Sequence, residues 1–173
     1  MITALVNARV LGEPGFERGK AVLIQENRIV DVCPRNDARV ERAHCVDLQD
    51  QLLIPGFIDV QVNGGGGALF NDDPSVGAIR TIGAAHRRFG TTGFLPTLIS
   101  DDLHVVSQAI AAVQAAVQAR VPGVLGIHIE GPFLREARKG VHDASKFREL
   151  DDSSLELLAS LDYEKGGEIA RNL

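Results

Sequence analysis

Short runs of apolar residues alternating with polar ones occupy the first third of the chain. Glu26 and Asn27 separate two of these runs and form a candidate two-residue hairpin turn, because Asn tolerates the left-handed backbone region. No segment before residue 53 has the period of a helix, so the pattern predicts a small antiparallel sheet layer. The β-type runs are residues 3–11, 21–25, 28–33 and 45–48.

From Pro55 onward the pattern changes to apolar strands that alternate with helix-period segments. Such repeated βα units with short connections predict an α/β fold with a parallel sheet, either doubly wound or closed as a barrel. A complete eight-unit barrel needs about 250 residues, so three units would be less than half of one. The predicted strands are 56–62, 93–98 and 124–130, and the predicted helices are 75–89, 103–120 and 152–161.

Composition narrows the class of protein. The chain has 173 residues, 45% of them hydrophobic, and a formal net charge of −5. Without a run of Lys and Arg, a nucleic acid partner is not expected. No window approaches the roughly 20 apolar residues of a membrane span, so no membrane association is expected either. Cys33 and Cys45 make neither a disulfide framework nor a CxxC pair, which favours reduced thiols and a cytoplasmic location.

The candidate chemistry centres on Glu130 and His142. Glu130 ends an apolar strand that Gly131 and Pro132 prevent from continuing, and His142 follows on a glycine-containing loop. A carboxylate at the C-terminal end of a parallel strand suits a metal ligand or catalytic acid, and a loop imidazole suits substrate binding or proton transfer. A salt-bridge role for Glu130 and a solvent-exposed position for His142 stay open on this local evidence.

Other polar residues share the same predicted sheet face. Gln61 and Asn63 project together from the end of their strand, where two amides suit the orientation of a water or a polar substrate. The glycines at 64–67 permit close approach to a ligand, although a flexible turn is an equally good explanation. His128 is interpreted as a hydrogen-bonded interior histidine behind the ligands. The aspartates at 72–73 and 101–102 precede helices and are interpreted as caps.

Taken together, these residues resemble the amidohydrolase superfamily and, within it, the N-acetylglucosamine-6-phosphate deacetylase family. Residues 55–59 are similar to the first-strand signature of the superfamily. The resemblance runs from Met1 to about residue 161. The segments similar to the deacetylase family in particular are 61–67, 95–98, 126–134 and 139–142.

The resemblance implies a metal-dependent hydrolase that removes acetate from N-acetylglucosamine 6-phosphate in amino-sugar catabolism. It implies part of a small β-sandwich in residues 1–53 and the first three βα units of a (β/α)8 TIM barrel in residues 54–161. Homodimers are expected from the same resemblance. Residues 162–173 depart from the family pattern, because the family continues there with an apolar strand and this chain is polar and glycine-broken.

The resemblance also implies roles for single residues. Glu130 is similar to the metal-ligating glutamate, and Val141 (through its backbone) and His142 are similar to substrate-contacting positions. Gln61 and Asn63 stand where many superfamily members have a His-x-His metal pair, which implies one divalent ion, Zn²⁺, rather than two. The family's two histidine ligands and its catalytic aspartate lie on later strands that this sequence does not contain, so no catalytic residue is expected in it.

A catalytic zinc site normally uses three protein ligands. We therefore expect this chain by itself to bind metal weakly and to release no acetate. The alternative is a non-catalytic remnant that acts as an interaction module or complements a C-terminal fragment. A dihydroorotase or an aminoacylase is disfavoured, because either is expected to keep His-x-His at the positions of Gln61 and Asn63.

Overall fold

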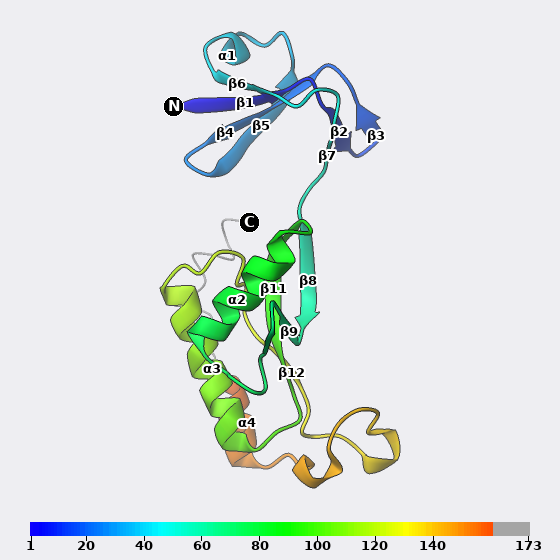
Figure 1. Cartoon of the computed structure of the whole chain (residues 1–173), viewed down its shortest axis with the longest axis vertical. Coiled ribbons are helices and arrows are strands. Elements are labelled where there is room, and N and C mark those ends of the chain that lie inside the picture. Colours follow the sequence, from blue (N-terminus) through cyan, green and yellow to red (C-terminus); the bar gives the residue numbers. More distant parts are fainter. Residues whose placement is uncertain (161–173) are drawn as a thin grey trace. The chain divides into compact units, whose positions relative to one another are not determined.

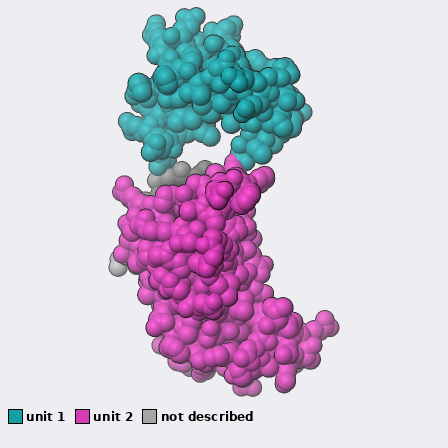
Figure 2. All heavy atoms as spheres, viewed as in Figure 1, with its two compact units in different colours: residues 1–55 teal, residues 56–173 magenta. Residues whose placement is uncertain are grey.

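The computed structural model describes residues 1–160 (Figure 1). The chain forms two compact units, Met1–Pro55 and a second unit that begins at Gly56 (Figure 2). The predicted divergent tail, 162–173, lies outside the described residues. The structure is α/β with mixed sheets, and the assignment of the two units to a β-sandwich portion and a barrel portion stays a prediction.

The first unit contains a four-stranded sheet in the order β5-β4-β1-β6 and a three-stranded sheet in the order β3-β2-β7. The prediction of a purely antiparallel, helix-free layer was wrong. Strand β6 runs parallel to β1 because a short helix, α1, carries the chain back before it re-enters the sheet. The elements are β1 (Ile2–Val6), β2 (Arg9–Gly12), β3 (Gly15–Glu17), β4 (Lys20–Gln25), β5 (Arg28–Pro34), α1 (Ala38–Glu41), β6 (His44–Asp47) and β7 (Leu52–Leu53).

Two turns in this unit follow directly from their residues. Glu26 and Asn27 have φ values of 51° and 66° and connect β4 to β5, so the predicted hairpin is confirmed. The run predicted at 3–11 is two strands rather than one. Asn7 interrupts it with a φ of 56°, and its side-chain amide donates to Oδ2 of Asp47 at 2.9 Å.

The second unit is built on a three-stranded parallel sheet in the order β12-β11-β8. The predicted strand 124–130 is shorter in the structure, where only His128–Glu130 pairs continuously and Val124 makes an isolated bridge to Phe94. The elements are β8 (Phe57–Val62), β9 (Gly64–Gly65), β10 (Ala68–Leu69), α2 (Val76–Arg87), β11 (Thr91–Ile99), α3 (Leu103–Gln118), β12 (His128–Glu130), the 3₁₀ turns η1 (Glu136–Arg138) and η2 (Ala144–Lys146), and α4 (Asp152–Ala159).

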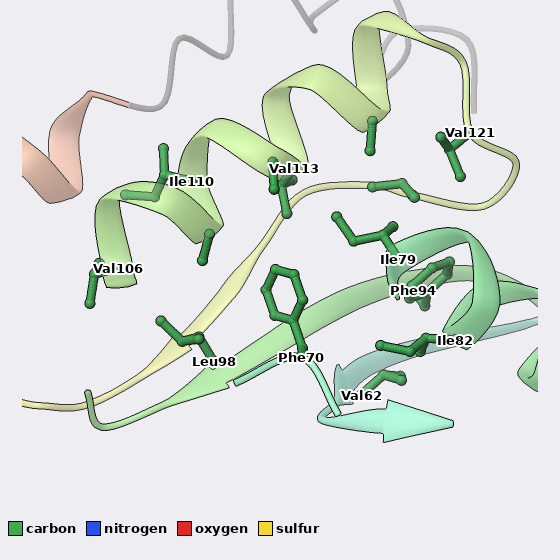
Figure 3. Packing of buried hydrophobic residues seen from close by; sticks show 14 residues of the cluster. Val62, Phe70, Ile79, Ile82, Phe94, Leu98, Val106, Ile110, Val113 and Val121 are labelled. Atoms are coloured by element: carbon green, nitrogen blue, oxygen red, sulfur yellow. The ribbon is translucent and has the colours of Figure 1, made fainter. Parts of the chain in front are cut away.

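Helices α2 and α3 pack against the sheet and against each other (Figure 1). Figure 3 shows Phe70 between α3 and the strands, with Leu98 and Phe94 on the strand side. The buried residues of α3 are spaced three and four apart, so they form one face of the helix. Several of them are alanines, whose small side chains allow the helix to lie close to the sheet. Its buried residues are Val106, Ala109, Ile110, Ala112, Val113 and Ala116.

Among the described residues, no helix is long and apolar enough to cross a membrane. Both cysteines are free thiols; Cys33 is buried in the core of the first unit and Cys45 is exposed. The core of the second unit is continuous from β8 to α3. The carboxyl ends of the parallel strands therefore rest on a packed layer, which gives side chains at that edge a defined position.

Candidate functional site

Three strands of the second unit deliver polar side chains to one edge of the sheet. Because β8, β11 and β12 are parallel, their carboxyl ends lie together. The register places Glu130 of β12 beside Ile99 of β11, and Pro96 of β11 beside Val62 of β8. Glu130, Ser100 and Gln61 are thereby brought to the same end of the sheet.

Glu130, at the end of the outer strand β12, contacts residues from both other parts of this edge. Its Oε2 accepts a hydrogen bond from Nε2 of Gln61 at 2.9 Å, and its Oε1 lies 3.4 Å from Nε2 of His142. The Glu130 side chain is 34% exposed, so its carboxylate is reachable from solvent. The structure thus brings together three of the residues singled out in the sequence.

His142 is buried rather than exposed, with a side-chain exposure of only 6%. His142 lies on a loop, as predicted, but the solvent-exposed alternative for its side chain is wrong. Nδ1 lies 2.8 Å from the hydroxyl of Ser100 and accepts a hydrogen bond from the Ser100 backbone N–H at 3.3 Å. The ring of Phe147 lies beside the imidazole, with a centroid distance of 6.4 Å.

Sequence reasoning missed Ser100. The residue follows β11, which runs to Ile99 rather than to the predicted end at Leu98. Extending that strand by one residue would have placed Ser100 at the carboxyl edge, in the same kind of position as Glu130. A polar residue directly after a buried apolar strand was the available signal.

His128 belongs to a separate hydrogen-bonded group within the sheet. Its Nδ1 lies 3.2 Å from Oγ1 of Thr97, the residue beside it in register. The same fully buried hydroxyl accepts a hydrogen bond from the backbone N–H of Val62 at 2.9 Å. Thr97 thus links all three strands, and this environment agrees with the interpretation of His128 as an interior histidine.

The structure does not place the other two predicted residues among these contacts. Asn63 is half-buried, and its backbone carbonyl accepts a hydrogen bond from the N–H of Phe70 at 2.8 Å. Val141 is 89% exposed, which leaves its side chain in solvent beside the buried His142. A role for Val141 therefore depends on its main chain, as the resemblance implies.

Lys146 attaches the loop that carries His142 to the end of β11. Its ammonium lies 3.4 Å from Asp101 and 2.5 Å from Asp102. This ammonium holds the pKa of Asp102 below its usual value, and Asp102 in turn raises the pKa of Lys146. Asn71 extends the connection by donating to Asp101 at 3.2 Å. The part of the loop that follows His142 is thus fixed near the candidate site.

The capping interpretation of the paired aspartates was correct only for the position of Asp102. Asp102 occupies the N-cap position of α3 but makes no side-chain hydrogen bond to the helix, because its carboxylate faces Lys146. The first turn of α2 is capped by Ser75, whose hydroxyl accepts from the N–H of Ala78 at 3.1 Å. Asp72 and Asp73 therefore precede that helix without capping it.

The side chains at this edge offer fewer ligands than a catalytic zinc ion requires. No group of three or more His, Cys, Asp or Glu side chains that could hold a metal ion occurs among residues 1–160. Glu130 offers one carboxylate, and Nδ1 of His142 is already engaged with Ser100. A catalytic zinc site takes three protein ligands, so the described residues alone do not fit that ion.

Comparison with known proteins places this geometry in context. No protein-family model matches the sequence. An N-acetylglucosamine-6-phosphate deacetylase from Haemophilus influenzae is 35% identical over 148 residues, which are 85% of this chain and 38% of that protein. The human protein of the same name is 32% identical over 168 residues, which are 90% of this chain and 38% of that protein.

The chain is thus similar in sequence to proteins named N-acetylglucosamine-6-phosphate deacetylase. It spans well under half of the length of the deacetylases that it matches. An N-acetylgalactosamine-6-phosphate deacetylase from Shewanella is also similar, with 50% identity over 96 residues, which are 56% of this chain and 24% of that protein.

Solved structures agree with this relationship. The crystal structure of N-acetylglucosamine-6-phosphate deacetylase from Pasteurella multocida has a TM-score of 0.87 and 31% identity, and the match covers 93% of this chain and 42% of that one. The Mycobacterium smegmatis deacetylase has a TM-score of 0.73 at 24% identity, over 97% of this chain and 44% of that one, and supports the fold alone. The match to these deacetylases includes both compact units, because it extends over nearly all of the chain.

Proposed function

We propose that this chain supplies the N-terminal part of an enzyme that hydrolyses the acetamide of N-acetylglucosamine 6-phosphate to glucosamine 6-phosphate and acetate. The observation that carries the proposal is the meeting of Gln61, Glu130 and His142 at the carboxyl edge of a parallel sheet. The choice of reaction is supported by the similarity of the chain to proteins named N-acetylglucosamine-6-phosphate deacetylase.

Within this proposal, Glu130 is the one ligand that the described residues contribute to a divalent metal ion, with Zn²⁺ as the expected ion. Gln61 holds one oxygen of that carboxylate and orients the other toward His142. His142 and the main chain of Val141 contact the substrate. The remaining ligands and the acid–base aspartate come from protein beyond these residues, so no chemical step is assigned to this chain alone.

The finer architecture belongs to the same proposal. Residues 54–161 are the first three βα units of a TIM barrel, and residues 1–53 are part of a β-sandwich. All-parallel pairing of β8, β11 and β12, with helices between them, supports the barrel assignment. A cytoplasmic location and a homodimer follow from the family resemblance. The non-catalytic interaction module is less favoured, because proteins named as deacetylases match most of this chain.

A second candidate substrate is N-acetylgalactosamine 6-phosphate. The 50% identity to the Shewanella protein of that specificity favours it. The two sugars differ in the configuration of one hydroxyl, while the acetamide and phosphate are common to both. The proposed role of Glu130 is therefore the same for either substrate, and the assay includes both.

A hybrid enzyme tests the proposal. In it, residues 1–160 of this chain replace the matching N-terminal segment of the Haemophilus influenzae relative, and acetate release is measured with each sugar phosphate and added Zn²⁺. We expect the hybrid to turn over and this chain alone to be inactive. A folded hybrid that releases acetate from neither sugar would contradict the proposal.

Two variants of the hybrid isolate the role of Glu130. Glu130→Gln removes the carboxylate that faces the site, and Glu13→Gln alters an exposed carboxylate in the turn between β2 and β3. Glu130→Gln is expected to lower kcat/KM by more than the 10- to 100-fold typical of a lost outer partner of a metal ligand. Equal activity of the two variants would show that the Glu130 carboxylate has no role in the reaction.

A further inference from the structure

We propose that Ser100 is a positioning residue for His142, and that it holds the imidazole as the tautomer whose Nε2–H points at Glu130. The importance of this position rests on the proposed function, in which His142 contacts the substrate. The contacts themselves are independent of that function, because they are made within the chain. Ser100 touches neither substrate nor metal in this scheme and acts through the ring of His142.

The backbone N–H of Ser100 decides the tautomer. This group can only donate, and it lies 3.3 Å from Nδ1 of His142 with geometry suited to a hydrogen bond. Nδ1 must therefore carry a lone pair, and in the neutral ring the proton is then on Nε2. Nε2 is the nitrogen that lies 3.4 Å from Oε1 of Glu130. The Ser100 hydroxyl, 2.8 Å from Nδ1, adds a second and shorter donor.

Gly131 explains why the hydroxyl has this position. A Cβ at residue 131 would lie only 2.0 Å from Oγ of Ser100, and the backbone there has a φ of +95°. A glycine directly after Glu130 thus creates the space that the hydroxyl fills. Ser100 and His142 are each 6% exposed, so little water is available to replace either contact.

Burial of His142 makes the hydrogen bonds of its imidazole hard to replace. A buried ring nitrogen that loses its donor is not compensated by solvent, so the ring is expected to change tautomer or orientation instead. Within residues 1–160, the remaining polar contact of the ring is with Oε1 of Glu130, on the Nε2 side. Ser100 therefore supplies both donors to the Nδ1 side, one from its main chain and one from its side chain.

Nitrogen-15 NMR of this chain tests the proposal without any assay of activity. Long-range proton–nitrogen spectra of the histidine-labelled chain distinguish a ring protonated at Nε2 from one protonated at Nδ1. The His142 signals are assigned by their disappearance in His142→Gln. At a pH at which the ring is neutral, we expect one tautomer, with the proton on Nε2 and Nδ1 as the acceptor. A ring protonated at Nδ1 would overturn the proposal, whatever the variants do.

Three variants then separate positioning from simple packing. In Ser100→Ala, the backbone N–H of residue 100 remains, so the Nε2–H tautomer is expected to persist, while loss of the shorter hydroxyl contact is expected to shift the Nδ1 signal toward that of a more weakly hydrogen-bonded nitrogen. Ser100→Thr keeps the hydroxyl and is expected to restore the wild-type pattern. Ser107→Ala changes an exposed serine on α3 and is expected to leave it unchanged. A Ser100→Ala spectrum identical to that of the wild type would refute the role of the hydroxyl.

The two proposals fail in different experiments. If the hybrid enzyme releases no acetate while His142 shows the Nε2–H tautomer, the proposed function fails and the positioning of the ring stands. If the hybrid is active but His142 is protonated at Nδ1, the role of Ser100 fails and the function stands. The two measurements share no variant and no readout.

Discussion

Gln61 donates a hydrogen bond to Glu130 across the end of a strand that lies between them. The two residues are 69 positions apart and belong to β8 and β12, the outer strands of the sheet order β12-β11-β8. The contact is 2.9 Å long, so the side chains span the width of β11 at its carboxyl end. One oxygen of the carboxylate is thereby fixed, while the other remains on the side of His142.

Replacing Gln61 by Leu in the hybrid enzyme is expected to lower kcat/KM by roughly 10- to 100-fold, the usual cost of removing a partner that orients a metal ligand. Leu keeps most of the volume but cannot donate to Glu130. Gln108→Leu alters an exposed glutamine on α3 and serves as the control. Equal activity of the two variants would show that the Gln61 contact has no role in the reaction.

Gly131→Ala is expected to destabilise the second unit more than Gly140→Ala does. Both glycines have positive φ, so an Ala at either is expected to cost about 1–2 kcal/mol in backbone strain. Only at Gly131 does the new Cβ also meet an atom, Oγ of Ser100 at 2.0 Å, whereas none lies within 4 Å at Gly140. The clash is expected to add about 1–3 kcal/mol. Urea denaturation measures both losses, and equal values would contradict the close packing of Ser100.

Alanine substitutions at two glycines of α2 are expected to have opposite effects on stability. Ala at Gly83 would place Cβ 2.7 Å from Cε1 of the buried Phe94, whereas Ala at Gly77 meets only Oγ of Ser75 at 3.5 Å. Gly83→Ala is expected to lower the free energy of unfolding by about 1–3 kcal/mol through overpacking. Gly77→Ala is expected to raise it by up to about 1 kcal/mol, because Ala favours helix. Thermal unfolding tests the sign, and stabilisation by both variants would contradict the close contact with Phe94.

Asp37 in the first unit is expected to titrate far below an ordinary aspartate. Hydrogen bonds from the Arg39 side chain and backbone lower its pKa from 3.8 to about 2. Because the folded-state pKa is depressed, its contribution to stability is present above the unfolded pKa near 3.9 and is lost as the pH falls through about 2. NMR titration of the carboxyl measures this pKa.

Substitution at Arg39 checks the cause of that shift. Arg39→Gln is expected to move the midpoint of Asp37 back toward 3.8, although the Arg39 backbone N–H, 2.9 Å from Oδ1, keeps it somewhat lower. Arg42→Gln alters an exposed arginine at the end of the same helix and is expected to leave the midpoint unchanged. An unchanged midpoint in Arg39→Gln would assign the shift to another group.

Local rules predicted the elements that depend on a few adjacent residues. The Glu26–Asn27 turn, the helices α2 and α3 and the strand that ends at Glu130 were all correct in type, because turn chemistry and helix period are properties of the chain itself. The boundaries were less accurate: the strand predicted at 124–130 pairs continuously only over its last three residues. Pairing depends on the neighbouring strand, which the local pattern does not contain.

The sequence pattern also did not predict that β6 runs parallel to β1. Strand direction is set by the path of the preceding connection, here through α1, and alternation of apolar residues is the same in either direction. The aspartates before α2 and α3 show the same limit. Their chemistry suits capping, but Ser75 is the cap of α2, and Lys146, 44 positions along the chain, engages Asp102 instead.

By itself, the sequence determined the kind of chemistry: a carboxylate at a strand end, an imidazole on the following loop, and two amides on a neighbouring strand. It also carried the resemblance to the deacetylases. Only the tertiary structure decided that His142 is buried, that Gln61 reaches Glu130, and that Ser100 lies within hydrogen-bonding distance of the imidazole. The reason is physical, because these contacts join residues 42 and 69 positions apart, and only strand register and loop packing bring such residues within hydrogen-bonding distance.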